Sequence, residues 1–301
     1  MKVSYLWVFV LISHLIILTP ITAVAGMTSE EVTAFERYKL NANMGDRVAQ
    51  FNLGVCYARG QGVERDDTQA ALMYQKAAEQ GLAQAQFNLG RAYERGEGVK
   101  KDYVQAIYWW LQAAHQGLAQ AQFNVGICYQ GGIGGVKKSP EQAVTWFRKA
   151  AEQGLAQAQY KLGHAYAQGN GITENLDKSM EWYLKAAEQG HADAQSLAGF
   201  GYYLGIGIQE DKAKALFWWL KAAAQGDGAS QNFIGDLYFS GEVVGKNKIE
   251  AYAYWKIAGA TIDNAKKISK LEKDLSTEEI LAGQRRAVEL QKQIAAKMAG
   301  K

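Results

Sequence analysis

The segment from Gly81 to Gln116 reads GLAQAQFNLGRAYERGEGVKKDYVQAIYWWLQAAHQ and is one of several similar units in this 301-residue chain. Within it, apolar and small residues recur every three or four positions, which is the spacing of one face of an α-helix. The first stripe contains Leu82, Ala85, Leu89, Gly90 and Tyr93, and the second contains Ala106, Trp109, Trp110, Ala113 and Ala114. Because Gly96 and Gly98 separate the two stripes, the segment predicts two helices joined by a tight turn.

The same unit recurs through most of the chain. One glycine returns at intervals of 36 or 37 residues, at Gly54, Gly90, Gly126, Gly163, Gly199 and Gly235, each with a tyrosine three positions later. These landmarks divide residues 45–260 into six units with the bounds 45–80, 81–116, 117–153, 154–189, 190–225 and 226–260. A glycine inside a helix costs about 1 kcal/mol relative to alanine, so six of them predict close approach between helices.

Each second helix has a predicted N-cap. The cap position holds only residues whose side chains accept hydrogen bonds: Asp66, Asp102, Ser139, Asn175, Asp211 and Asn247. Such side chains bind free N–H groups of the first turn. Pro140 follows Ser139, at the first helical position, where proline is tolerated. Capping and periodicity therefore agree on an all-α chain of helix-turn-helix units.

Composition narrows the class of protein. Hydrophobic residues make up 48% of the chain and charged residues 21%, which excludes a disordered chain. Lys and Arg number 33 against 30 Asp and Glu, giving +3, which is too small an excess to favour a nucleic-acid partner. Two cysteines exclude a scaffold held together by many disulfides.

The first 25 residues are predicted to be a signal peptide. Lys2 is followed by an apolar run from Leu6 to Leu18, and Ala23-Val24-Ala25 has the small residues that precede signal-peptidase cleavage. An uncleaved anchor is the alternative, although a membrane span needs about 20 apolar residues and this run is shorter. Cleavage before Gly26 would export the chain, to the periplasm or outside the cell, with no stable membrane span left.

The repeated unit resembles the Sel-1-like repeat (SLR) family, which is related to the tetratricopeptide repeat. The resemblance rests on the pattern A-x-A-Q-x-x-L-G-x-x-Y-x-x-G-x-G-V-x-x-D-x-x-x-A-x-x-W-[YW]-x-x-A-A-x-x-G, which recurs across residues 45–260. The last unit departs from it at Ser230, Val243 and Gly259. The resemblance implies a right-handed superhelical alpha-solenoid that serves as a scaffold for protein complexes, as in secreted bacterial members of the family.

Both ends of the solenoid are predicted to carry capping helices. In residues 26–44, Ala34 and Tyr38 lie 36 positions before Ala70 and Tyr74, so this segment is half a repeat. Residues 261–301 include Ser276-Thr277-Glu278-Glu279, a capping box. The helix after it is expected to cover the last repeat with one face, formed by Ile280, Leu281, Ala287, Val288, Ile294 and Met298. A partner-binding or membrane-surface helix is the alternative.

The tryptophans and cysteines are interpreted as core residues. Seven tryptophans fall in the predicted second helices, where they share the stripe of small residues, so packing between repeats is favoured over a ligand cage. Cys56 and Cys128 occupy the same repeat position two units apart. Helix layers stack about 8–10 Å apart, which places these thiols beyond the reach of a disulfide.

A search for catalytic chemistry finds no candidate. No serine has a lysine three positions later, the segment 228–232 lacks the closing glycine of a nucleophile elbow, and 131–139 lacks the ending of a phosphate loop. His14, His115, His164 and His191 show no metal-ligand spacing. We therefore predict no catalytic residue, no metal site and no cofactor.

The candidate binding residues lie on the first helices, beside the core stripe. The position of Arg91 varies freely between units, as Val55, Arg91, Ile127, His164, Phe200 and Asp236. Variation on a regular scaffold is typical of a recognition surface. We expect Arg91, Ile127, His164 and Phe200 to line the concave groove of the solenoid and to contact a protein or peptide partner. Phe87 belongs to an aromatic ladder with Phe51, Phe123 and Tyr160, for which inter-repeat packing is the favoured interpretation.

Three classes of function follow. The first is an exported, non-enzymatic scaffold or adaptor in the bacterial envelope or at a host surface. The second is an envelope protein that binds or hydrolyses cell-wall fragments or beta-lactams, a role linked to cysteine-rich relatives whose two cysteines per repeat this chain lacks. The third, a nucleic-acid binder, is disfavoured by export and by the near-neutral charge.

Overall fold

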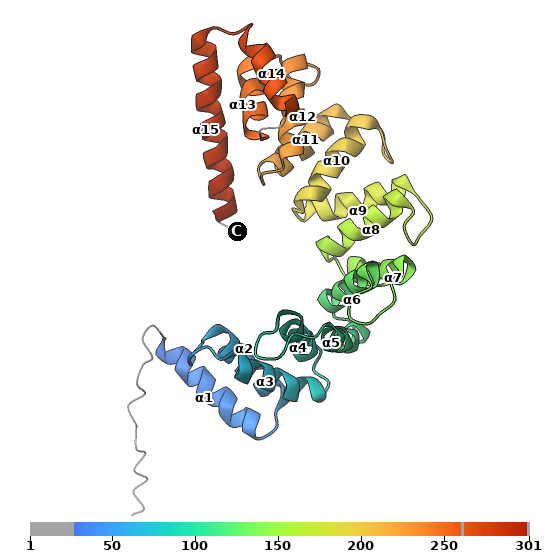
Figure 1. Cartoon of the computed structure of the whole chain (residues 1–301), viewed down its shortest axis with the longest axis vertical. Coiled ribbons are helices and arrows are strands. Elements are labelled where there is room, and N and C mark those ends of the chain that lie inside the picture. Colours follow the sequence, from blue (N-terminus) through green and yellow to red (C-terminus); the bar gives the residue numbers. More distant parts are fainter. Residues whose placement is uncertain (1–26, 260–261, 300–301) are drawn as a thin grey trace, which may run out of the picture.

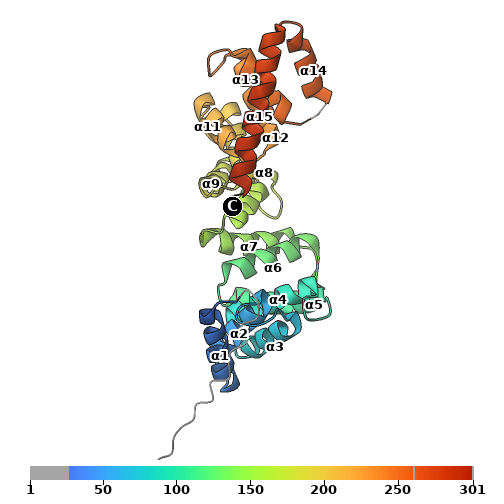
Figure 2. The same cartoon turned by 90° about the vertical axis from the view of Figure 1, so that its left-hand side faces the viewer.

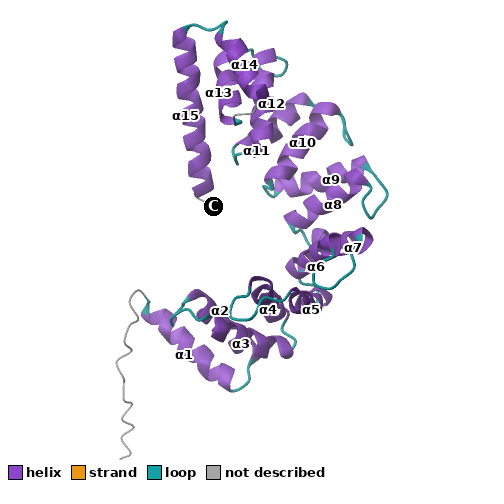
Figure 3. Ribbon diagram, in the orientation of Figure 1, coloured by secondary structure: helices purple, strands orange, loops and turns teal. Residues whose placement is uncertain are grey.

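The computed structural model describes residues 27–259 and 262–299, which contain fifteen α-helices and no strand (Figure 3). The helices form antiparallel pairs that follow one another along an arc open on one side (Figure 1). The view turned by 90° shows the pairs stacked along the long axis of the molecule (Figure 2). The prediction of an all-α superhelical solenoid is confirmed. The predicted signal peptide, residues 1–25, lies outside the described residues.

Six helix pairs make up the repeats. The first helices are α2 (Arg47–Arg59), α4 (Ala83–Arg95), α6 (Ala119–Gly131), α8 (Ala156–Gln168), α10 (Ala192–Leu204) and α12 (Gly228–Ser240). The second helices are α3 (Asp67–Glu79), α5 (Tyr103–His115), α7 (Pro140–Glu152), α9 (Leu176–Glu188), α11 (Lys212–Ala223) and α13 (Lys248–Ile257). The flanking helices are α1 (Ser29–Asn43), α14 (Ile262–Glu272) and α15 (Thr277–Ala299). No helix in the described part of the chain is both long and apolar enough to cross a membrane.

Local signals set the ends of the helices as predicted. All six predicted N-cap side chains accept a hydrogen bond from a first-turn N–H; Asp102 Oδ1, for example, accepts from Val104 N at 2.8 Å. The first helices end at glycines in the left-handed conformation, such as Gly96 with φ 73°. Only glycine adopts this conformation at little cost.

Two glycines in each of the first five repeats permit close packing. A Cβ on Gly90 would lie 2.5 Å from the Trp110 ring, so this glycine lets the two helices of one repeat touch. A Cβ on Gly98 would lie 1.9 Å from the carbonyl oxygen of Asp67 in the preceding repeat. The loop glycine therefore sets the contact between repeats, a role that the sequence pattern alone did not reveal.

Helix α1 takes the place of a missing second helix. A Cβ on Gly62 would meet Glu31 O at 2.3 Å, the same kind of contact that Gly98 makes with Asp67. Phe35 and Ala42 are buried on α1, and Gln50 Nε2 donates to Ala42 O at 3.3 Å. Helix α1 therefore packs on the first repeat in the way that a second helix packs on the repeat after it.

The C-terminal capping box is also confirmed, since Ser276 N donates to Glu279 Oε2 and Glu279 N donates to Ser276 Oγ. The predicted buried face of α15 is wrong in part. Leu281, Val288 and Met298 were expected to cover the last repeat, but they are 49%, 49% and 59% exposed.

The residues of α15 that pack on the solenoid recur every three or four positions, on one narrow face of the helix. Gly283, Ala287 and Leu290 are buried, and Ile280 and Ile294 are half-buried. A small residue is required at Gly283 because a Cβ there would lie 2.7 Å from the Tyr252 ring on α13. Arg286, which is not part of the predicted face, is drawn toward the solenoid by Glu250, whose Oε1 lies 2.8 Å from the guanidinium Nε. Contact with α13 therefore determines which face of α15 is buried, and this face does not contain all of its most apolar residues.

Candidate partner-binding grooves

Consecutive first helices form the walls of a groove, and the second helix between them forms its floor. We call each of these an inter-repeat groove. The one between α2 and α4, over α3, holds a cavity of about 410 Å³ and is called the N-terminal groove below. The equivalent cavity between α6 and α8 is only about 10 Å³, and that between α8 and α10 is about 190 Å³.

Three of the predicted binding residues line these grooves. Arg91 lies on the wall of the N-terminal groove, His164 lines the cavity between α6 and α8, and Phe200 lines the cavity between α8 and α10. Ile127 is half-buried on α6 and lines none of the cavities described for residues 27–259 and 262–299. The structure therefore distributes the variable position over separate grooves and does not gather it into one pocket.

The aromatic ladder packs against the second helices. The ring centroids of Phe51 and Tyr74 are 5.9 Å apart, and those of Phe123 and Phe147 are 5.8 Å apart. Phe87 is half-buried against the cluster around Trp110, whose Nε1 donates to Phe87 O at 3.2 Å. Most of the tryptophans are core residues as interpreted; Trp110 is 3% exposed and Trp219 is fully buried, whereas Trp109 and Trp182 are only half-buried.

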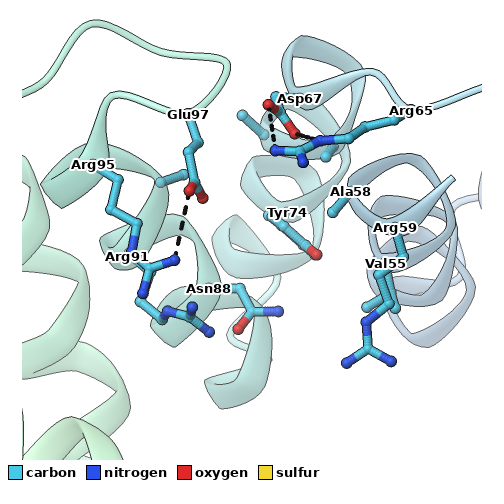
Figure 4. Close-up of a pocket in the computed structure, with 13 residues that line it drawn as sticks. Val55, Ala58, Arg59, Arg65, Asp67, Tyr74, Asn88, Arg91, Arg95 and Glu97 are labelled. Atoms are coloured by element: carbon cyan, nitrogen blue, oxygen red, sulfur yellow. Dashed lines mark hydrogen bonds and ion pairs between the residues drawn. The ribbon is translucent and has the colours of Figure 1, made fainter.

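The N-terminal groove is lined by charged side chains (Figure 4). Arg65 makes two 2.9 Å hydrogen bonds to the Asp67 carboxylate, and Arg95 lies 3.5 Å from Glu97. Four arginines and two acids line the groove, which leaves an excess of two positive charges. Sequence reasoning singled out Arg91 alone, because Arg59, Arg65 and Arg95 reach the groove from other positions of the repeat.

Tyr74 forms the floor of the same groove. Burial raises the pKa of its phenol, while the Asn88 side chain and the positive charges of Arg59 and Arg91 oppose that rise. The positive charges of Arg59 and Arg91 therefore act on the same phenol. Figure 4 shows Asn88 between Arg91 on one wall and Arg59 on the other.

The middle of the solenoid carries two histidines. The imidazole of His191 stacks on Tyr160 with centroids 4.6 Å apart, and its Nδ1 accepts from Ala194 N at 3.4 Å as the N-cap of α10. The ring centroids of His164 and Tyr160 are 6.3 Å apart. Burial, aided by the nearby Lys161, lowers the pKa of both imidazoles. Asp193 opposes this effect at His191.

The groove between α8 and α10 is apolar. Its lining includes Met180, Tyr183, Leu197, Phe200 and Ile206. Phe200 also packs edge-on against Phe233 of the next repeat, with centroids 4.7 Å apart. The same place in the fold is thus charged near the N-terminus and apolar in the middle.

The last member of the variable series is covered by the chain itself. Lys267 on α14 lies 2.9 Å from Asp236 Oδ1 and 3.1 Å from Asn232 Oδ1. Helix α14 follows α13 in the chain, where a further first helix would follow. Asp236 on α12 is therefore bound by a C-terminal capping helix.

Both cysteines are buried and unpaired. Burial raises the pKa of the Cys128 thiol to about 11 and raises that of Cys56 as well. Across residues 27–259 and 262–299, no group of three or more His, Cys, Asp or Glu side chains is arranged to hold a metal ion.

The six helix pairs match one known family of repeats. The family model of the Sel1 repeat matches residues 47–82, 83–118, 119–155, 156–191, 192–227 and 228–260. Among curated proteins, none matches the chain.

Two solved structures are similar over most of the chain. One is a protective antigen present in uropathogenic Escherichia coli strains and displaying an SLR fold, with 31% identity and a TM-score of 0.78 over 89% of this chain. This chain covers 58% of that antigen's length. The other is a Sel1 repeat protein from Oxalobacter formigenes, with 32% identity and a TM-score of 0.63, covering 78% of this chain and 98% of that one.

Proposed function

Because this chain belongs to the Sel1 repeat family, whose solenoids are generally scaffolds for protein–protein interaction, we propose that it is an exported, non-enzymatic adaptor. In this proposal it binds a protein or peptide partner in its inter-repeat grooves. The observation that carries the proposal is that a position holding a different residue in each of the six repeats lines these grooves, at Arg91, His164 and Phe200. A rigid row of equivalent grooves with unlike linings can distinguish one extended partner from another.

Export is the second part of the proposal. It is supported by the apolar run from Leu6 to Leu18 followed by Ala23-Val24-Ala25. Expression of the full-length chain in its own host, followed by fractionation and N-terminal sequencing, tests it. We expect a mature chain that begins at Gly26 outside the cytosol; an intact N-terminus in the cytosol or membrane would overturn this part.

Groove binding is tested by site-specific photocrosslinking in the native host. A photoreactive phenylalanine analogue at position 200 samples the apolar groove, and the same analogue at Tyr108, which is 50% exposed on a second helix, is the matched control. We expect a discrete adduct with one partner from position 200 and none from position 108. Equal capture from both positions would contradict binding in the grooves.

Non-enzymatic action is tested with the purified mature chain. Incubation with a panel of beta-lactams and muropeptides, followed by mass spectrometry, should show neither turnover nor an acylated protein. Hydrolysis of any panel member that is abolished by a single substitution in a groove would replace the adaptor proposal with an envelope enzyme.

A further inference from the structure

The N-terminal groove has two cationic groups without an internal counter-ion. Arg65 and Arg95 are each paired with an acid of the groove wall. Within the described residues, neither Arg59 nor Arg91 lies within ion-pair distance of a carboxylate. Arg59 is exposed at the end of α2, and Arg91 is half-buried on α4. Like charges that face one another across a groove are most stable when an anion lies between them.

The groove also offers space and neutral hydrogen-bonding groups. Its cavity of about 410 Å³ falls within the usual range for ligand sites. The Asn88 amide and the Tyr74 hydroxyl lie between the two walls (Figure 4). Guanidinium groups bind carboxylates through two parallel hydrogen bonds, and an amide or hydroxyl can supply a further donor.

Neither of the other two inter-repeat grooves described above is lined by an arginine. The equivalents of Arg59 in the third, fourth and fifth repeats are Gly131, Gln168 and Leu204. The groove between α8 and α10 is apolar, so a uniformly basic surface is not a property of the scaffold. The arginines therefore make the N-terminal groove more positively charged than the groove between α8 and α10.

We propose that the N-terminal groove binds an acidic peptide segment, with side-chain carboxylates held between Arg59 and Arg91 and hydrogen-bonded by Asn88. This inference rests on the proposed function, because it specifies the chemistry of the partner that the grooves bind. It predicts that the partner presents acidic residues at the N-terminal end of the solenoid.

A labelled hexaglutamate peptide with blocked ends is the probe, and hexaglutamine is its neutral control. Fluorescence anisotropy with the mature chain should show hexaglutamate bound at least tenfold more tightly than hexaglutamine, and the binding should weaken as salt rises. The double variant Arg59→Gln/Arg91→Gln should bind hexaglutamate at least tenfold more weakly. Arg59→Lys/Arg91→Lys should fall between, because lysine keeps the charge but loses the paired hydrogen bonds.

The matched control is Arg148→Gln/Arg285→Gln, which removes the same charge from two exposed arginines elsewhere. Circular dichroism and melting temperature establish that all variants fold. If the control loses as much affinity as the groove variant, binding reflects net charge and the inference is wrong. Equal affinity for the two peptides also overturns it.

The photocrosslinking experiment separates this inference from the proposed function. If position 200 captures its partner in the Arg59→Gln/Arg91→Gln background as efficiently as in the parent, and hexaglutamate does not bind the parent chain, the acidic-segment inference fails while groove binding stands. Loss of capture in that background, with capture kept in the Arg148→Gln/Arg285→Gln control, supports both.

Discussion

The side-chain amide of Gln116 donates to Gln86 Oε1 across 2.8 Å, joining the end of α5 to the buried side of α4. Gln86 Nε2 in turn donates to Ala78 O at the end of the preceding second helix, at 3.1 Å. One glutamine therefore connects both helices of its own repeat to the previous repeat. The buried glutamines that donate in this way are Gln50, Gln86, Gln122, Gln159, Gln195 and Gln231. The sequence pattern contains this residue, but only the structure assigns its role.

Replacing one of these glutamines should destabilise the solenoid. In Gln122→Leu, Ala114 O loses a donor and the Gln153 amide loses its 2.7 Å bond to Gln122 Oε1. We expect the free energy of unfolding to fall by about 1–3 kcal/mol, the cost of leaving buried polar groups unsatisfied. Urea denaturation measures the change. Gln120→Leu, at an exposed position on the same helix, is the control and should change stability much less.

The loop glycines should differ sharply from the glycines that follow the second helices. Both Gly98 and Gly117 have positive φ, at 69° and 92°. A Cβ on Gly98 would lie 1.9 Å from Asp67 O, whereas nothing lies within 4 Å of a Cβ on Gly117. We expect Gly117→Ala to cost about 1–2 kcal/mol from backbone strain alone. Gly98→Ala should cost clearly more, because the repeats must separate. Equal losses in melting temperature would mean that this contact does not hold the repeats together.

Acidification should destabilise the middle of the solenoid. Burial lowers the pKa of His164 and His191 below the ordinary value of 6.5, so the unfolded chain binds more protons at these sites than the folded chain. Stability therefore rises with pH. The stabilisation by the neutral His164 and His191 is complete above the unfolded pKa of about 6.5. It is lost as pH falls from there through the lowered pKa values of the folded chain.

Urea midpoints at pH 7.5, 6.5 and 5.5 measure this slope. The double variant His164→Gln/His191→Asn should flatten it, with asparagine retained as an N-cap at position 191. His115→Gln, which changes an exposed imidazole, is the matched control. If the double variant keeps the same slope, the pH dependence of stability does not come from His164 and His191.

The thiols should be unreactive until the chain unfolds. Burial raises the pKa of Cys128 to about 11, and the reactive thiolate is therefore scarce at pH 8. Iodoacetamide should label the native chain slowly at both cysteines and should add two groups per chain in denaturant without reductant. Mass spectrometry after alkylation decides the result. A denatured chain that takes up no label would reveal a Cys56–Cys128 bridge, which the stacking of the repeats forbids.

Local chemistry in the sequence was sufficient to predict the helices and their ends. Asp102 caps α5 and Gly96 ends α4 because these effects act within one turn of the chain, through a side chain or a φ angle. The six-fold recurrence then made the solenoid predictable, since each unit can bury its apolar stripe only against its neighbours.

Tertiary contacts decided the rest. Helix α15 buries Leu290 and exposes Leu281 because Tyr252 and Glu250 on α13 select the face that carries Gly283 and Arg286. Periodicity alone cannot make this choice when two faces of one helix are both apolar. In the same way, Arg59 and Arg91 lie 32 positions apart in the sequence and share a groove only because α2 and α4 stand side by side over α3. Which residues meet across such a groove depends on the angle between successive repeats, and that angle is set by buried glutamines and loop glycines acting between units.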